Sequence, residues 1–343
     1  MSIRNIVGWP FSVLYGSITR LRNHLFDIGY TKSFNFEVMT INVGNLSVGG
    51  TGKSPMIEYL ARLLKKDFRT ATLSRGYGRK TRGFQLAGPK DNALTLGDEP
   101  FQFYRKFGTE IMVAVGAERA LAIPEMLQHQ EDLELILLDD AFQHRYVQAD
   151  LNIMLTEYDR PFFHDFILPA GRLREARKGA DRADIIVVTK CPDHIQEDNY
   201  RAEIQRYAPE ASVFFSKIAY GRPQALENGQ TGAKVYLFSG IAQPGPFEEF
   251  VGQQYEVMAH ERFSDHHAYT EEELRKIADN FKASGADFIL TTEKDAVKLV
   301  VSAFDSWRKD LPLFYLPIEV EFLKDQMAFD ALVKAAIEKK YAQ

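Results

Sequence analysis

The feature that most constrains the fold is a glycine-rich segment between a strand pattern and a helix pattern. Apolar and polar residues alternate over 36–43, and an amphipathic helical run covers 56–64. Between them lies Asn45-Leu46-Ser47-Val48-Gly49-Gly50-Thr51-Gly52-Lys53-Ser54. Strand, glycine-rich turn, Lys-Ser and helix in this order are typical of a P-loop, in which backbone N–H groups and the helix N-terminus surround phosphate oxygens.

The residue types of this loop suit nucleotide phosphates and Mg²⁺. The predicted nucleotide-binding residues are Ser47, Val48, Gly49, Gly50, Thr51, Gly52, Lys53 and Ser54. Lys53 is predicted to reach the β- and γ-phosphates, and Ser54 is predicted to bind Mg²⁺. The general P-loop pattern has glycine where this chain has Ser47. An ordinary glycine-rich turn is the alternative, but the flanking strand and helix patterns favour the P-loop.

Composition indicates a soluble globular protein with two domains. A chain of 343 residues is long for one hydrophobic core, and its 45% hydrophobic and 26% charged residues are ordinary for a folded protein. The net charge of −5 does not indicate nucleic-acid binding. Cys191 is the only cysteine, which excludes an internal disulfide.

The order of apolar runs predicts an α/β fold: a P-loop NTPase-type, mostly parallel sheet with helices on both faces. Strands are expected at 38–43, 71–73, 111–115, 133–138, 151–155 and 185–188, with helices at 55–64, 100–107 and 118–128. A Pro/Gly/Asn-rich segment at 223–231 predicts a short linker to a smaller C-terminal α/β domain. The predicted domains are therefore 31–222 and 223–343.

Residues 1–30 predict an amphipathic N-terminal helix. Its apolar face comprises Phe11, Leu14, Ile18, Leu21, Leu25 and Ile28, spaced by three and four residues. Pro10 suits the first helical turn and Gly29 suits the end. Two interpretations stay open: the helix lies in a membrane interface, or it packs on the protein's own core.

Acidic residues after an apolar run supply candidate metal and acceptor groups. Asp139 and Asp140 end the run 133–138, where P-loop proteins carry the acid that holds Mg²⁺. Asp98 precedes a helix that begins near Pro100, so it is either an N-cap or a general base for a hydroxyl acceptor. His266, next to His267, is better placed to tune a carboxylate base than to bind zinc, because adjacent side chains do not share a face.

Two basic loops suggest an anionic ligand. Ser74-Arg75-Gly76-Tyr77-Gly78-Arg79-Lys80 and Leu168-Pro169-Ala170-Gly171-Arg172-Leu173-Arg174-Glu175 both carry guanidinium groups that can bind phosphate. A third segment, 187–193, is similar to the guanine-reading motif of GTPases. The fit is poor, because Pro192 stands where that motif has Asp and Asp193 comes one residue too late.

Taken together, the motifs resemble the tetraacyldisaccharide 4'-kinase family, the lipid A 4'-kinases of Gram-negative bacteria. The resemblance rests on the P-loop, the two basic loops and several further motifs in order along 42–295. These are Gly97-Asp98-Glu99-Pro100, Asp139-Asp140-Ala141-Phe142-Gln143-His144, Val188-Thr189-Lys190-Cys191-Pro192, Ser239-Gly240-Ile241-Ala242, Asp265-His266-His267 and Thr291-Thr292-Glu293-Lys294-Asp295. Ser47 belongs to this family's own pattern, whereas Ala141 stands where glycine is expected.

The resemblance implies a kinase that transfers the γ-phosphoryl group of ATP to the 4'-hydroxyl of a bisacylated glucosamine disaccharide 1-phosphate. It implies Mg²⁺ held by Ser54, Asp139 and Glu175, with Arg174 stabilising the transferred group. Asp98 would accept the hydroxyl proton, helped by His266. Candidates for binding the disaccharide headgroup are Tyr77, Arg119, Asp140, Gln143 and His144.

The resemblance also implies a peripheral, monotopic enzyme on the cytoplasmic face of the bacterial inner membrane. It favours membrane contact for the N-terminal helix, and no obligate protein partner is inferred. Two alternatives remain: a P-loop GTPase or metal-centre maturation factor, and a nucleotide-gated membrane adaptor without phosphoryl transfer. The paired acids and Asp98 argue against the adaptor, because gating needs no acceptor base.

Overall fold

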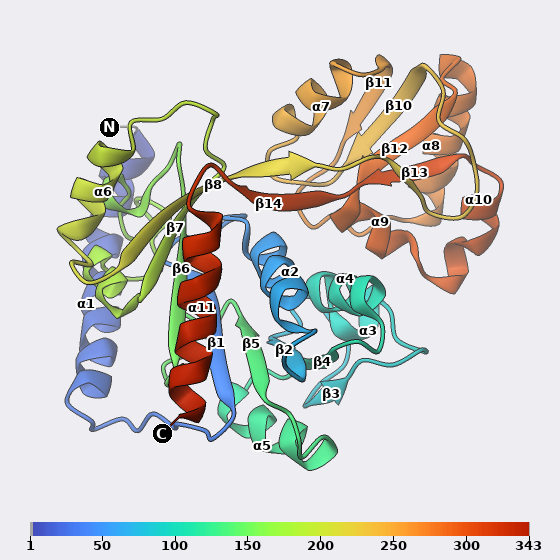
Figure 1. Ribbon diagram of the computed structural model, residues 1–343. Helices are drawn as coiled ribbons and strands as arrows, with labels where there is room; N and C mark the ends of the chain where they lie inside the picture. Colours follow the sequence, from blue (N-terminus) through green and yellow to red (C-terminus); the bar gives the residue numbers. More distant parts are fainter. Residues whose placement is uncertain (1–2, 343) are drawn as a thin grey trace. The chain divides into compact units, whose positions relative to one another are not determined.

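The computed structural model describes residues 3–342 and has the predicted α/β architecture (Figure 1). The chain forms two compact units, and each is assembled from separate stretches of sequence. The first unit contains the chain up to Arg75, residues 109–218 and the chain from Val320 onward, and the second contains 76–108 and 219–319. Residues 1–2 of the predicted N-terminal segment lie outside the described residues.

The first unit is built on a mostly parallel sheet. Its strand order is β14-β8-β7-β6-β1-β5-β2-β4, and β1, β2 and β4–β8 are joined by parallel pairings. The strands are β1 Met39–Asn45, β2 Thr70–Ser74, β4 Met112–Val115, β5 Leu135–Asp139, β6 Leu151–Glu157, β7 Ile185–Thr189, β8 Ser212–Tyr220 and β14 Ile318–Phe322. β1, β2, β5 and β7 are buried along their whole length, as consecutive apolar residues predict for a sheet covered on both faces.

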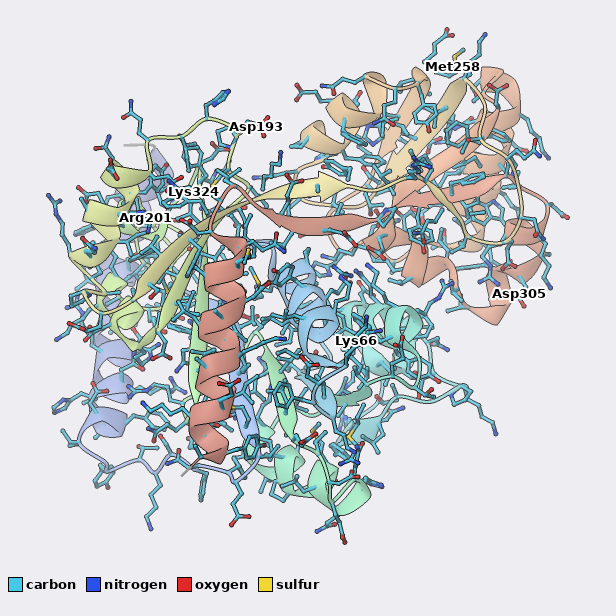
Figure 2. All side chains as sticks on the ribbon, viewed as in Figure 1. Lys66, Asp193, Arg201, Met258, Asp305 and Lys324 are labelled. Carbon is cyan, nitrogen blue, oxygen red and sulfur yellow. The ribbon has the colours of Figure 1, made fainter. Side chains whose placement is uncertain are left out.

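Helices and short 3-10 turns complete this unit. They are α1 Ile3–Asp27, α2 Lys53–Leu64, α5 Arg119–His129, η1 Phe162–His164, η2 Arg177–Arg182, α6 Glu197–Gln205 and α11 Gln326–Tyr341. The C-terminal α11, red in Figure 1, runs along the sheet and buries Phe329, Val333 and Ile337. Glu197 of α6 forms ion pairs with two cations: Lys324, just before α11, at 3.1 Å, and Arg201, also at 3.1 Å. Figure 2 labels both cations.

The polar segments of the first unit gather at one edge of the sheet. β1 leads into the P-loop, β5 ends at Asp139, β6 ends at Glu157 and β7 ends at Thr189. Because these strands are parallel, all four ends point to the same edge, which is where open α/β sheets bind ligands. The fold therefore places the predicted phosphate site where the sequence pattern expects it.

The N-terminal helix α1 packs on the first unit through small and polar side chains and through Phe26, which is buried and lies edge-on to Tyr146. The Ser12 hydroxyl donates to the Ile167 carbonyl at 2.9 Å and accepts from the Ala170 amide at 2.9 Å, while Gly8 and Gly16 let the loop 167–170 approach closely. The opposite face, with Phe11, Leu14, Ile18, Leu21 and Ile28, is 59% to 64% exposed. These five side chains of the predicted apolar face therefore do not pack on the protein, whereas the sixth, Leu25, is half-buried.

The expectation for Pro10 was wrong. α1 begins at Ile3, so Pro10 lies inside the helix and leaves one carbonyl of the preceding turn without an amide donor. None of the described helices is long and apolar enough to cross a membrane.

The second unit has its own sheet, with strand order β11-β10-β12-β13-β9. The strands of this sheet are β9 Gln224–Ala225, β10 Lys234–Ser239, β11 Glu256–Arg262, β12 Phe288–Thr292 and β13 Leu313–Leu316. The unit also contains β3 Gln85–Leu86, which is not part of this sheet. Its helices are α3 Ala93–Leu96, α4 Asp98–Phe107, α7 Gly245–Gly252, α8 Glu271–Ser284, α9 Glu293–Leu299, η3 Ser302–Phe304 and α10 Asp305–Lys309. A capping box formed by Thr270 and Glu273 starts α8.

The compact units are discontinuous, whereas the predicted domains 31–222 and 223–343 follow the chain linearly. Residues 76–108, which carry Tyr77 and Asp98, belong to the second unit, and α11 belongs to the first. The chain crosses between the units four times, and β8 and β14 are each shared by both.

Candidate active site

The P-loop has the backbone conformation that a phosphate cradle requires. Gly49 and Gly52 have φ of 115° and 88°, a region that residues with a Cβ rarely adopt. Gly52 is the N-cap of α2 and makes no side-chain cap, so Lys53 and Ser54 open the helix. Backbone N–H groups at this end are free to bind an anion, and the helix dipole favours negative charge there.

Two neighbouring segments hold the P-loop in place. The Val48 amide donates to the Arg172 carbonyl at 2.8 Å and the Arg174 amide donates to the Leu46 carbonyl at 2.7 Å, forming a short antiparallel pair. On the other side, the Thr189 hydroxyl at the end of β7 donates to the Thr51 carbonyl at 2.9 Å. The first pair brings the basic loop 168–175 to the nucleotide site.

Asp140, Lys53 and Arg174 form a charged cluster beside the P-loop. Lys53 Nζ lies 3.6 Å from Asp140 Oδ1, and Arg174 donates to both carboxylate oxygens at 3.0–3.1 Å. Burial alone would raise the pKa of Asp140, but Lys53 and Arg174 outweigh it and hold this pKa below its ordinary value. Asp140 is therefore an anion at neutral pH that orients the two cations predicted to contact the transferred phosphoryl group.

Asp139 faces a different direction. It is buried, and its Oδ2 accepts a hydrogen bond from the Ser74 hydroxyl at 3.1 Å. Its carbonyl accepts from Arg119 Nη2 at 3.1 Å, while Arg119 Nη1 donates to the carbonyls of Gly116 and Ala117. Arg119 is only 2% exposed, so it is a buried side chain that holds the backbone at Asp139 in place.

Glu175 and Gln143 belong to a second polar cluster of the first unit. Glu175 is buried and accepts from both Arg182 nitrogens at 2.7 and 3.1 Å, from Asn23 at 2.6 Å and from Gln143 at 3.0 Å. Gln143 Nε2 also donates to the Asn45 carbonyl at 2.8 Å. Both oxygens of the Glu175 carboxylate thus accept hydrogen bonds, so a metal ion held by Glu175, as predicted, would have to compete with these donors.

His144 is held in its neutral form. Burial, and after it the positive charge of Arg119, lower the pKa of His144 to about 4. Its Nε2 is buried without a hydrogen-bond partner among the described residues. A neutral imidazole with a free nitrogen can accept from or donate to a ligand hydroxyl, depending on its tautomer.

The second unit brings Asp98 and His266 together. Asp98 Oδ2 lies 3.5 Å from His266 Nδ1, with the two side chains 21% and 37% exposed. Asp98 is the first residue of α4 and Gly97 is the N-cap, without a side-chain cap hydrogen bond, so the capping interpretation of Asp98 was wrong. Tyr77, whose side chain is largely exposed, lies edge-on to the His266 ring at a centroid distance of 5.7 Å.

Sequence reasoning assigned no role to two cations around this pair. Lys298 Nζ lies 4.0 Å from Asp98 Oδ2, and Lys294 Nζ lies 3.0 Å from His266 Nε2. Lys294 lies inside one of the family motifs, and its spacing of four residues from Lys298 was the signal available in the sequence. Thr189 and Arg182 were also missed as partners of the P-loop and of Glu175.

The segment similar to a guanine-reading motif is occupied by internal ion pairs. Lys190 Nζ contacts Glu157 Oε1 at 2.5 Å, and Asp193 pairs with Lys217 at 2.8 Å. These contacts, together with Pro192, do not support guanine recognition.

Comparison with known proteins identifies the relatives of this arrangement. The family model described as "Tetraacyldisaccharide-1-P 4'-kinase" matches residues 4–338. This chain belongs to that family. The tetraacyldisaccharide 4'-kinase of Flavobacterium johnsoniae is 44% identical over 342 residues, covering 97% of each chain. The enzyme of that name from Bacteroides fragilis strain YCH46 is 42% identical over 339 residues, covering 93% of this chain and 89% of its own.

A solved structure of the family shares the fold. The crystal structure of LpxK from Aquifex aeolicus in complex with ATP has a TM-score of 0.75 and 30% sequence identity, and the match covers 96% of this chain and 98% of that chain. Membership in the tetraacyldisaccharide 4'-kinase family confirms the resemblance inferred from the ordered motifs.

Proposed function

We propose that this chain is an ATP-dependent kinase that phosphorylates the 4'-hydroxyl of a tetraacyl glucosamine disaccharide 1-phosphate, a lipid A precursor, to give the 1,4'-bisphosphate. The observation that carries the proposal is the family match over residues 4–338. The Lys53–Asp140–Arg174 cluster beside the P-loop supports it. The alternative of a GTPase or metal-centre maturation factor is not favoured.

ATP binds on residues 47–54, with Lys53 at the β- and γ-phosphates. Arg174 is held by Asp140 next to Lys53, so a second cation is available for the charge that develops on the transferred group. As the bond between the γ-phosphorus and the 4'-oxygen forms, the bond to the β-phosphate oxygen breaks and ADP leaves.

The oxygen ligands near the P-loop suit Mg²⁺, which would neutralise phosphate charge when bound. Ser54 opens α2, and Asp139 lies at the end of β5. No group of three or more His, Cys, Asp or Glu side chains suited to a metal occurs among residues 3–342. Glu175 would have to leave Arg182 to become a direct ligand.

Asp98 accepts the proton of the 4'-hydroxyl, and His266 raises its basicity or orients it. The contact between Asp98 and His266 within the second unit supports this role. Transfer therefore requires Asp98 of the second unit to reach the nucleotide bound by the first. The proposed residues for binding the disaccharide headgroup are Tyr77 in the second unit and Arg119, Asp140, Gln143 and His144 in the first.

The acceptor is a membrane lipid, and α1 attaches the enzyme to the cytoplasmic face of the inner membrane as a peripheral, monotopic protein. The exposed apolar face of α1 supports this attachment.

A label-transfer assay tests the proposed function. The full chain is incubated in detergent with γ-labelled ATP, Mg²⁺ and a disaccharide 1-phosphate lipid, and the extracted lipid is counted. We expect label at the 4'-position, and none with Lys53→Ala. An unlabelled lipid would refute the kinase proposal, and preference for GTP with turnover in the absence of lipid would support the GTPase alternative.

A further inference from the structure

Helix α9 presents two lysines, one turn apart, to the groups around Asp98. Lys294 and Lys298 are four residues apart and therefore lie on the same side of the helix. Lys298 Nζ is 4.0 Å from Asp98 Oδ2, and Lys294 Nζ is 3.0 Å from Nε2 of His266, whose Nδ1 faces Asp98. All these residues belong to the second compact unit, so their arrangement is internal to one body.

Lys298 is fixed by a buried carboxylate. Its ammonium group lies 3.1 Å from Asp295 Oδ1, and Asp295 is fully buried. The other Asp295 oxygen accepts from the Gly240 amide at 2.9 Å and the Thr292 hydroxyl at 2.6 Å. Since the Lys298 side chain is only 8% exposed and lies over the Tyr269 ring, it cannot move freely. It therefore holds a positive charge at a set place opposite the Asp98 carboxylate.

Lys294 determines which nitrogen of His266 carries the proton. An ammonium group only donates hydrogen bonds, so at 3.0 Å Nε2 of His266 must accept. The neutral ring then carries its proton on Nδ1, the nitrogen that faces Asp98 at 3.5 Å. Asp265 partly balances this cation, with its Oδ1 3.5 Å from Lys294 Nζ. Its Oδ2 is 4.0 Å from Nε2 of His266, farther than the 3.0 Å between this nitrogen and Lys294 Nζ.

We propose that Lys294 and Lys298 are positioning residues for the acceptor base. Lys298 orients the Asp98 carboxylate directly, and Lys294 orients it through the tautomer of His266. This inference rests on the proposed function, in which Asp98 accepts the hydroxyl proton. It adds that His266 acts as an N–H donor to Asp98, so of the two roles given above His266 orients the carboxylate and does not raise its basicity. The proton taken from the sugar then stays on Asp98 and does not pass to the imidazole.

The tautomer can be observed without any reaction. Nitrogen NMR of the full chain with ¹⁵N-labelled histidine distinguishes a protonated from an unprotonated ring nitrogen, and the His266 signals are assigned from His266→Gln. We expect Nδ1 protonated and Nε2 unprotonated in the wild type, and loss of this preference in Lys294→Met. Wild-type protein with the proton on Nε2 would overturn the assignment. The Lys294 side chain is 27% exposed, so this substitution should leave the fold intact.

Kinetics test the same proposal by a second route. We expect Lys298→Met to lower kcat roughly 10–100-fold with little change in the KM for ATP, because a misplaced reacting group slows transfer without affecting the P-loop. Lys298→Arg, which keeps the charge, should recover most of the loss. Lys282→Met, on the exposed end of α8 in the same unit, is the matched control and should behave as the wild type.

Each outcome separates the inference from the function on which it rests. If Asp98→Asn is inactive while the Lys294 and Lys298 variants keep normal kcat, the positioning role of the lysines is wrong, but Asp98 can still be the base. If Asp98→Asn is fully active, the base itself is wrong. A raised KM for ATP with normal kcat in Lys298→Met would instead make Lys298 a nucleotide ligand, against the proposal.

Discussion

At the residue scale, Asp98 combines a partly exposed carboxylate with cationic and imidazole neighbours and has no capping role. We expect Asp98→Asn to lower kcat about 10²–10⁴-fold, the usual effect of removing a general base. ATP affinity and the thermal unfolding midpoint should stay unchanged, because the side chain neither caps α4 nor belongs to the P-loop unit. The measurements are lipid phosphorylation, nucleotide binding and a thermal melt.

The matched control for Asp98 is Glu99→Gln, which removes the neighbouring carboxylate from the same helical turn. A similar loss of activity in this control would show that the negative charge of the first turn of α4 matters, and not a specific base at Asp98. A clear fall in thermal stability in Asp98→Asn with retained kcat would contradict the catalytic role.

His144 makes a prediction about pH. Its folded pKa of about 4 is below the ordinary 6.5, so between these values the unfolded chain binds a proton that the folded chain does not. The free energy of unfolding therefore falls as pH decreases from 6.5 towards 4. We expect the wild type to lose about 1–2 kcal/mol more than His144→Gln between pH 7 and pH 5 in urea titrations. Equal losses would show that His144 does not titrate in this way.

At the scale of the elements, α1 packs on the first unit through one face, and the exposed face that carries Leu14 and Ile18 is the one we propose to contact the membrane. Changing Leu14 and Ile18 to Glu removes apolar surface from the exposed face. We expect binding to vesicles of anionic phospholipid to fall strongly in co-sedimentation, while the thermal unfolding midpoint remains unchanged, because neither side chain packs on the protein.

Gly16→Leu tests the other face of α1. A Cβ at Gly16 would lie 3.1 Å from Ile167 Cδ1, so a larger side chain should push α1 away from the rest of the first unit and lower the thermal unfolding midpoint of the protein.

For the variants with Glu at positions 14 and 18, vesicle binding equal to that of the wild type would contradict the membrane role of the exposed face.

The same scale shows how far sequence reasoning can reach. Local patterns were sufficient for β1, β2, β5–β7 and the P-loop, because consecutive apolar residues and glycine spacing are properties of short segments. The pairing of Ser47 with Leu173 was not predictable, since it joins segments far apart in the chain through backbone groups that every residue carries. The lysines near Asp98 were missed for a related reason: their partners come from α4 and the loop before α8.

At the scale of the whole molecule, α11 completes the unit that contains the P-loop. Phe329 is fully buried against Tyr59 of α2, Phe214 and Phe322. We expect Phe329→Ala to lower the free energy of unfolding of this unit by about 3–5 kcal/mol in urea titrations. Met327→Ala, which removes an exposed side chain of the same helix, is the control. Equal stability of the two variants would contradict the assignment of α11 to the first unit's core.

The linear domain boundary at residue 223 could not foresee this arrangement. Composition marks the Pro/Gly/Asn-rich segment at 223–231, but it does not reveal that the chain returns after Glu319. Composition also does not show that residues 76–108, between β2 and β4, fold together with residues 219–319, which lie more than a hundred positions later in the chain. Such contacts depend on which surfaces match in three dimensions, and a local pattern does not record this.

The discontinuous first unit has a consequence for synthesis on the ribosome. Its last segment, from Val320 onward, is translated after all of residues 219–319, a stretch of roughly a hundred residues that takes roughly 5–20 seconds to make. Until then the sheet lacks β14 and the cover supplied by α11. A nascent chain should therefore be unable to bind ATP stably before residues 219–319, which belong to the unit that carries Asp98, have been translated.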